Sequence, residues 1–102
     1  MIQKKYYLKK DTVLDERYLI DEAIGEGGFG ITYAGENTRI GLKVAIKEFC
    51  SRELMDRDVS VSNEFSLIDP AEEERFQKEK NRFLKEARIL GDFSGEPGIV
   101  HV

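Results

Sequence analysis

The stretch Gly25-Glu26-Gly27-Gly28-Phe29-Gly30 is a glycine-rich loop, and Val44-Ala45-Ile46-Lys47 follows it at the distance expected for a strand hairpin. Glycines at the first, third and sixth positions of the loop allow tight curvature and close approach of the backbone to phosphate oxygens. The residues that follow, Ile31-Thr32-Tyr33-Ala34-Gly35, have the composition of a strand, whereas a dinucleotide-binding turn requires a helix there. The loop therefore predicts a strand–loop–strand hairpin, for which an ordinary tight turn is the alternative interpretation.

Lys47 makes the nucleotide interpretation more specific. It lies among Val44, Ala45, Ile46 and Phe49, in a strand that should be buried. A buried ammonium group without a partner is costly, so Lys47 needs a carboxylate, a phosphate or both. The alternative is a lysine that extends outward at the edge of the sheet. Together with the glycine loop, the lysine favours a site for nucleotide phosphates.

Glu86 is the candidate carboxylate partner for Lys47. It lies three residues after Phe83 and four before Leu90, so it flanks the apolar face of a predicted helix. Glu79, two turns earlier, is the competing candidate, but its neighbours in the sequence are more polar. A solvated surface charge is the alternative interpretation for either glutamate.

The helix that carries both glutamates has clear end signals. Asp69 is a suitable N-cap, and Pro70 suits the first helical position. Gly91 is the expected end, about 20 residues later. The apolar side chains recur with the period of one helical face, and they are Phe76, Phe83, Leu84, Ala87 and Leu90.

The segments before this helix fit a small antiparallel sheet. Apolar and β-branched residues separated by Gly-rich and Asn-containing turns predict successive strands. The expected strands are residues 17–24, 29–35 and 42–49, and a further strand begins at residue 99.

Two segments lie outside this pattern. Residues 1–16 are polar and are interpreted as a lead-in, so the domain itself is expected to span residues 17–102. Residues 50–69 form an extra, mostly polar connection, which holds at most a short strand near residues 59–61. A connection of this length in a small domain is often functional or mobile.

Composition limits the functions of the chain. Its 102 residues, 35% charged and 40% hydrophobic, suffice for one small soluble domain. The net charge of −4 and the lack of a basic surface interleaved with aromatics argue against nucleic-acid binding. Cys50 is the single cysteine, so a reducing, cytoplasmic location fits best. No apolar run approaches the roughly 18 residues of a membrane span, and no metal-ligand set is recognisable.

Taken together, these residues resemble the N-terminal, ATP-binding lobe of a eukaryotic-type Ser/Thr protein kinase of the bacterial kind. The resemblance covers about residues 18–102 and rests on four elements in the right order. It implies an α+β fold with a small antiparallel sheet, here without the family's fifth strand, and one regulatory helix. The matching positions are Gly25, Gly27 and Gly30 in the loop, Lys47 in the VAIK strand, Glu86 in the helix, and Ile99 and Val100 in the fourth strand.

The resemblance also implies which residues bind ATP. Ile24 and Ala45 would contact the adenine ring from opposite sides, and Thr32 stands where the family usually has Val. Phe29 would lie at the loop tip. Lys47 would hold the α- and β-phosphates and pair with Glu86. Backbone N–H groups of the loop would approach the phosphates, and the glycines concerned are Gly25, Gly27, Gly28 and Gly30.

The chain contains neither an H-R-D catalytic loop nor a D-F-G segment. The catalytic aspartate and the Mg²⁺ ligands of such a kinase would therefore lie outside this chain. We expect a parent protein that transfers phosphate from ATP to a protein substrate, and a fragment that is itself inactive. A non-catalytic, kinase-like interaction module is the alternative, and a dinucleotide-binding fragment ranks last.

Without a fifth strand beside it, the strand at 42–49 is expected to have an open edge, and the surface that meets the other lobe is expected to be exposed. Open strand edges and apolar patches promote association between copies. The sequence therefore predicts self-association of the isolated lobe.

Overall fold

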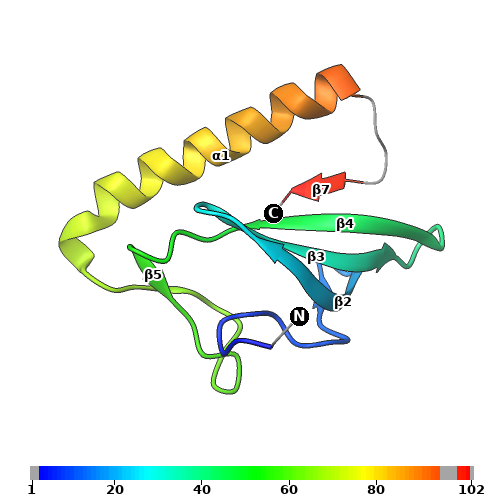
Figure 1. The fold of residues 1–102 in the computed structure, drawn as a ribbon, viewed down its shortest axis with the longest axis horizontal. Coiled ribbons are helices and arrows are strands. Elements are labelled where there is room, and N and C mark those ends of the chain that lie inside the picture. Colours follow the sequence, from blue (N-terminus) through cyan, green and yellow to red (C-terminus); the bar gives the residue numbers. More distant parts are fainter. Residues whose placement is uncertain (1–2, 95–98, 102) are drawn as a thin grey trace.

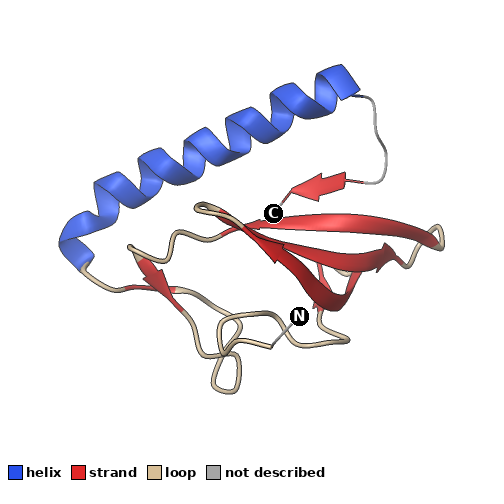
Figure 2. Ribbon diagram, viewed as in Figure 1, coloured by secondary structure: helices blue, strands red, loops and turns tan. Residues whose placement is uncertain are grey.

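The computed structural model describes residues 3–94 and 99–101, and it describes side chains from residue 3 to residue 85. An α+β fold is confirmed: one long helix crosses a curled sheet (Figures 1 and 2). The sheet order is β1-β2-β3-β4-β7, and β1 to β4 pair in antiparallel fashion. The strands of this sheet are β1 (Val13–Leu14), β2 (Tyr18–Glu26), β3 (Gly30–Asn37), β4 (Leu42–Phe49) and β7 (Ile99–His101).

Two turns of the sheet, β1–β2 and β3–β4, place residues in the left-handed region of backbone space. Asp15 and Glu16 join β1 to β2 with φ of 50° and 57°, values that match the twist of adjacent antiparallel strands. Gly41, between β3 and β4, has φ of 64°, which glycine adopts without steric cost. Asp and Gly at these positions are thus explained by the turns that they form.

One face of the sheet packs on the main hydrophobic core. Alternate residues of the central strands, among them Ile31, Tyr33 and Ile46, are fully buried beneath this face. Gly35 is part of the same packing, because a Cβ there would lie 2.6 Å from the carbonyl oxygen of Leu19. The opposite face of the sheet therefore remains for other contacts.

The N-terminal segment is not a simple polar lead-in, as the sequence suggested. Tyr6, Tyr7 and Leu8 are buried at 7%, 1% and 1% exposure, and they belong to the main core. In Figure 1 this segment (blue) lies on the side of the sheet away from the helix. The packed unit therefore includes residues before position 17.

The extra segment at 50–69 is also more ordered than its polar sequence indicated. It contains two short strands, β5 (Met55–Asp56) and β6 (Ser66–Leu67), which pair with each other. The short strand expected near residues 59–61 is wrong, because those residues form a turn. The buried side chains of Leu54 and Met55 form a second, smaller core with Phe49.

The helix begins as the sequence indicated. Asp69 caps it by accepting a hydrogen bond from the Ala71 backbone N–H at 2.9 Å, and Pro70 opens a short 3₁₀ turn, η1 (Pro70–Glu72). The helix α1 (Glu73–Ser94) follows directly. The expected end at Gly91 is wrong, because the helix continues to residue 94.

Aromatic contacts attach α1 to the sheet. The ring of Phe49, at the end of β4, lies 5.8 Å from Phe76 and 5.5 Å from Phe83 in edge-on and tilted arrangements. Leu84, expected on the same face, is 39% exposed. Ala87 and Leu90 have side chains outside the described residues. The contact of α1 with the sheet is therefore established for its first half.

The expected open edge of β4 is wrong over three residues. β7 pairs with β4 in parallel, with Ala45 opposite Ile99 and Lys47 opposite His101. The strand beginning at residue 99 is confirmed, but it lies directly beside β4 rather than one strand further away. Over these three residues, β7 therefore pairs with the edge of β4 that was expected to be open.

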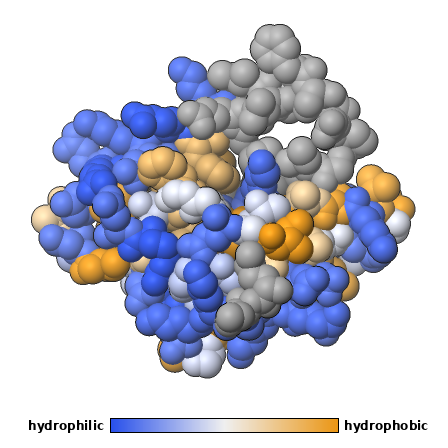
Figure 3. Space-filling view, viewed as in Figure 1, coloured by the Kyte–Doolittle hydropathy of each residue, from blue (hydrophilic) through white to orange (hydrophobic). Residues whose placement is uncertain are grey.

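The face of the molecule shown in Figure 3 is predominantly polar. Figure 3 shows a face that is mostly hydrophilic, with separate apolar areas rather than one continuous patch. Within the described residues, no helix combines the length and apolar character needed to cross a membrane.

Candidate functional site

The sheet face opposite the core brings together several of the residues singled out by the sequence. In the β3–β4 ladder, Thr32 lies opposite Lys47, and Ala34 lies opposite Ala45. Their neighbours Tyr33 and Ile46 point into the core, so these four side chains lie on the other face. All four are half-buried. The strand register therefore places Thr32, Ala45 and Lys47 on one surface.

Lys47 is half-buried, and within residues 3–85 its ammonium group makes no hydrogen bond or ion pair. Its expected partner, Glu86, lies on α1, but the Glu86 side chain is outside the described residues. The pairing of these two residues therefore stays a prediction.

The glycine loop joins β2 to β3 and is held at two points. The Gly27 N–H donates to the Gly30 carbonyl oxygen at 2.8 Å, which closes a tight turn. The Cys50 N–H donates to the Phe29 carbonyl oxygen at 3.0 Å, which ties the loop tip to the end of β4. The hairpin predicted from the sequence is confirmed, since β3 continues directly from Gly30.

Three of the loop glycines are not required by the packing of the fold. A Cβ at Gly25, Gly27 or Gly28 would meet no heavy atom within 4 Å. Gly30 differs, because a Cβ there would lie 3.1 Å from the Glu48 carbonyl oxygen. The open space beside the first three glycines is where another group can come close to the loop backbone.

Two further residues predicted to contact ATP, Ile24 and Phe29, lie at the rim of the sheet face that carries Lys47. Ile24 is 53% exposed and lies at a register shift in β2, between Ala23 and Gly25. Phe29, at the loop tip, is 52% exposed. Large apolar side chains so exposed beside a glycine loop are suited to contact a ligand or another protein segment.

Glu79, the competing glutamate, is more buried than its polar neighbours in the sequence suggested. Its side chain is 15% exposed, and it pairs with Arg75 at 3.4 Å. Its second carboxylate oxygen, Oε2, is buried without a hydrogen-bond partner in the described residues. Glu79 helps to line a pocket of about 180 Å³ between α1 and the glycine loop, together with Phe29, Arg82 and Phe83. This pocket does not include Lys47.

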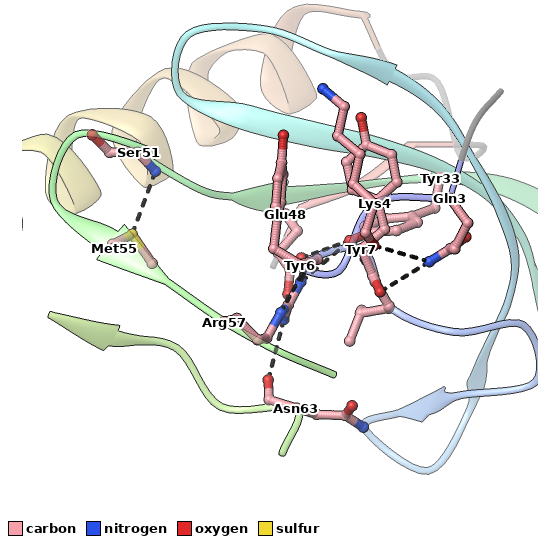
Figure 4. A network of polar contacts seen from close by, with 11 residues as sticks. Gln3, Lys4, Tyr6, Tyr7, Tyr33, Glu48, Ser51, Met55, Arg57 and Asn63 are labelled. Atoms are coloured by element: carbon pink, nitrogen blue, oxygen red, sulfur yellow. Dashed lines mark hydrogen bonds and ion pairs between the residues drawn. The ribbon is translucent and has the colours of Figure 1, made fainter. Parts of the chain in front are cut away.

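The sequence interpretation missed a polar network on the core side of the sheet. Arg57, with a side chain only 1% exposed, donates to Glu48 at 2.8 and 3.0 Å and to the Tyr6 carbonyl oxygen at 2.6 and 3.0 Å. It also donates to the Asn63 carbonyl oxygen, and Tyr33 donates to Glu48 at 2.9 Å. Figure 4 shows Arg57 at the centre of these groups. Nothing in the polar sequence around Arg57 distinguishes it from a surface arginine.

The network continues to the glycine loop through Glu26. The hydroxyl groups of Tyr6 and Tyr7 both donate to its carboxylate, and the Lys4 ammonium group lies 3.3 Å away. The apolar triplet Tyr6-Tyr7-Leu8 within a lysine-rich segment was the one signal of this role in the sequence. As for metals, no group of three or more His, Cys, Asp or Glu side chains in the described residues is arranged to hold an ion.

Comparison with known proteins supports the fold. No family model and no curated protein matches the chain. Among solved structures, the chain is similar to PpkA-294 in its apo form, a bacterial Ser/Thr kinase fragment, with 36% sequence identity and a TM-score of 0.77. The match covers 95% of this chain and 33% of that chain, so this chain spans about one third of the structure that it matches. The chain therefore has a kinase-like α+β fold over nearly its whole length.

Proposed function

We propose that this chain is the ATP-binding lobe of a Ser/Thr protein kinase, and that it positions the phosphates of ATP for transfer to a protein substrate. The observation that carries the proposal is the register of β3 and β4. It puts Lys47 on the sheet face that the core leaves free, beside the glycine loop. The likeness to PpkA-294 supports the same conclusion at the level of the fold.

The loop fits the triphosphate of ATP. The open space beside Gly25, Gly27 and Gly28 would let phosphate oxygens approach backbone N–H groups closely. Lys47 would supply the positive charge for the α- and β-phosphates. Among residues 3–85 its ammonium group has no competing partner, so it would not have to break an ion pair there to reach a phosphate.

The adenine ring would lie on the half-buried surface of the same face. Ala45 and Thr32 would form the floor beneath the ring with their small side chains, and Ile24 at the rim would cover it from the other side. The hydroxyl of Thr32 makes this floor slightly more polar than a valine would. A single sheet forms only one wall of such a site, and the pocket lined by Phe29 and Glu79 is a separate feature.

The chemistry of phosphate transfer would need residues that this chain does not contain. Magnesium bridges the ATP phosphates in kinases, and its ligands come from the D-F-G segment and the catalytic loop. Neither sequence is present here. We therefore infer that the isolated chain binds ATP but does not transfer its phosphate, and that a longer protein supplies the second lobe.

The proposal is tested by equilibrium binding of trinitrophenyl-ATP, a fluorescent ATP analogue. The variant Lys47→Met should weaken binding about tenfold or more, because a charge-assisted hydrogen bond to phosphate contributes about 1.5–3 kcal/mol. Lys43→Met is the matched control, since Lys43 lies on the same strand and face but is exposed. Absence of binding by the parent chain, or equal binding by both variants, would contradict the proposal and favour a non-catalytic interaction module.

A second comparison identifies the carboxylate partner of Lys47. We expect Glu86→Gln to weaken nucleotide binding or to alter its pH dependence, and Glu79→Gln to leave both unchanged. The reverse result would assign the role to Glu79, whose buried Oε2 lacks a partner in the described residues. Autophosphorylation by the isolated chain above the level of Lys47→Met would contradict its proposed inactivity.

Self-association of the isolated chain remains part of the proposal. β7 covers part of the β4 edge, so this edge contributes less to association than expected. Association between copies would then be driven by exposed apolar side chains beside the glycine loop, such as Ile24 and Phe29. Light scattering over a range of concentrations tests this. A single monomeric species at high concentration would contradict it.

A further inference from the structure

Glu26, at the start of the glycine loop, has a carboxylate that three residues of the N-terminal segment contact: Lys4, Tyr6 and Tyr7. The Tyr6 hydroxyl lies 2.7 and 2.9 Å from the two carboxylate oxygens of Glu26. The Tyr7 hydroxyl donates to Oε1 at 2.7 Å, and Lys4 pairs with the same oxygen at 3.3 Å. The Glu26 side chain is consequently only 18% exposed, although its backbone lies at the start of an exposed turn.

The groups that hold Glu26 are themselves fixed by the core. The rings of Tyr6 and Tyr7 are buried and meet edge to face, with centroids 5.0 Å apart. The Tyr6 carbonyl oxygen accepts two hydrogen bonds from Arg57. The Leu8 N–H donates to the Tyr33 hydroxyl at 3.1 Å. The two hydroxyl donors therefore belong to a rigid part of the molecule rather than to a loose terminus.

The protonation states of Glu26 and of the tyrosines favour these hydrogen bonds at neutral pH. Burial opposes ionisation of Glu26, but the hydrogen bonds from Tyr6, Tyr7 and Lys4 outweigh it and lower the pKa of the carboxyl group. Burial, reinforced by Glu26, raises the pKa of Tyr7 to about 12. At neutral pH the carboxylate is therefore charged, and the phenol keeps the proton that it donates.

The direction of the Glu26 side chain also matters for the proposed site. Glu26 lies opposite Ile31 in the β2–β3 ladder, so its carboxylate is on the core side of the sheet, away from Lys47. A carboxylate on the other face would repel phosphates beneath the loop. The strand register sets the face on which this negative charge lies, and the contacts with Tyr6 and Tyr7 fix its position there.

We propose that Tyr6 and Tyr7 are positioning residues for the glycine loop, and that they act through Glu26 to hold the loop ready for nucleotide phosphates. The inference rests on the proposed function. The loop is then fixed at two points, by Glu26 at its start and by the Cys50 N–H at its tip. A loop that is ordered before binding loses less conformational freedom when the nucleotide binds, and its affinity is correspondingly higher. The N-terminal segment thus sets the affinity of a site that it does not touch.

The test uses the double variant Tyr6→Phe/Tyr7→Phe, which removes both hydroxyl groups and keeps both buried rings. Tyr18→Phe is the matched control, since the Tyr18 hydroxyl makes no hydrogen bond in the described part of the chain. Hydrogen exchange of the loop amides, measured by NMR without nucleotide, should accelerate several-fold in the double variant only. Trinitrophenyl-ATP should bind it about threefold to tenfold more weakly than the control.

A second pair of variants separates positioning from a general loss of structure. Glu26→Gln keeps a hydrogen-bond acceptor and should retain much of the affinity, whereas Glu26→Ala should match the double tyrosine variant. The inference would be overturned if the loop amides of the double tyrosine variant exchanged no faster than those of the parent chain. It would also be overturned if they exchanged faster but the affinity for trinitrophenyl-ATP stayed the same. Failure of the parent chain to bind nucleotide would contradict the proposed function instead, and the exchange measurement would still show whether the tyrosines order the loop.

Discussion

Replacement of Arg57 by methionine is the most informative test of what holds this fold together. The Arg57 side chain is 1% exposed, and its guanidinium group donates to Glu48, to the carbonyl oxygens of Tyr6 and Asn63, and to the Tyr33 hydroxyl. It also lies 3.9 Å from the ring of Phe65. One side chain therefore joins the N-terminal segment, β4 and the extra segment at 50–69.

The expected cost follows from the partner that the mutation leaves behind. In Arg57→Met, the Glu48 carboxylate, whose side chain is 13% exposed, loses its only ion-pair partner in the described residues. Removal of one member of a buried pair typically costs about 3–5 kcal/mol. A small domain is stable by only about 5–15 kcal/mol in total, so the variant should lose a large share of its stability.

Urea unfolding followed by circular dichroism measures this loss. With a slope of about 1–3 kcal/mol per molar urea, the midpoint should fall by about 1 M or more. Lys10→Met is the control, because its ion pair with Asp21 is exposed on both sides and the midpoint should hardly move. Arg57→Lys keeps the charge but not the planar fork, so its midpoint should lie below that of the parent chain. This variant replaces Arg57→Met in the test if Arg57→Met does not fold. A midpoint for Arg57→Met as high as that of the control would refute the reasoning.

Three further predictions concern single positions. Gly35→Ala should destabilise the chain strongly, because a Cβ there would lie 2.6 Å from the Leu19 carbonyl oxygen, whereas Gly28→Ala should leave the urea midpoint unchanged. Burial raises the pKa of the Cys50 thiol to about 11, so a thiol reagent at pH 8 should label the native chain slowly and the urea-unfolded chain fast; equal rates would contradict its burial. Asp69→Ala should cost about 1 kcal/mol in the same unfolding assay, because it removes the helix cap, and no loss would show that the first turn forms without it.

Features with a local cause were predicted well from the sequence. The strands β2, β3 and β4 follow from apolar and β-branched runs between turn residues, and the start of α1 follows from Asp69 and Pro70. The glycine loop and Lys47 were recognisable because their residue types are unusual at that spacing. The structure confirms the hairpin and places Lys47 beside it, while their roles in binding ATP stay predictions.

Features with a distant cause were missed. Glu26 looks like a surface residue in the sequence, and only contacts from residues 19 to 22 positions earlier bury it. Arg57 is likewise indistinguishable from a solvated arginine until the fold brings Tyr6 and Glu48 to it. The end of α1 was misplaced because one glycine late in a helix costs only about 1 kcal/mol, too little to end the helix by itself.

The hydrogen bonds between Arg57 and Tyr6 join residues that are 51 positions apart, and this separation has a consequence for synthesis of the protein in the cell. Translation proceeds at about 5–20 residues per second, so Arg57 is made roughly 3–10 seconds after Tyr6. Until then the Tyr6 carbonyl oxygen and the Glu48 carboxylate lack the donors that Arg57 supplies in the folded chain. The contacts around the Tyr6 carbonyl oxygen can therefore be completed only after residue 57 has been synthesised, so we expect this part of the fold to be secured late.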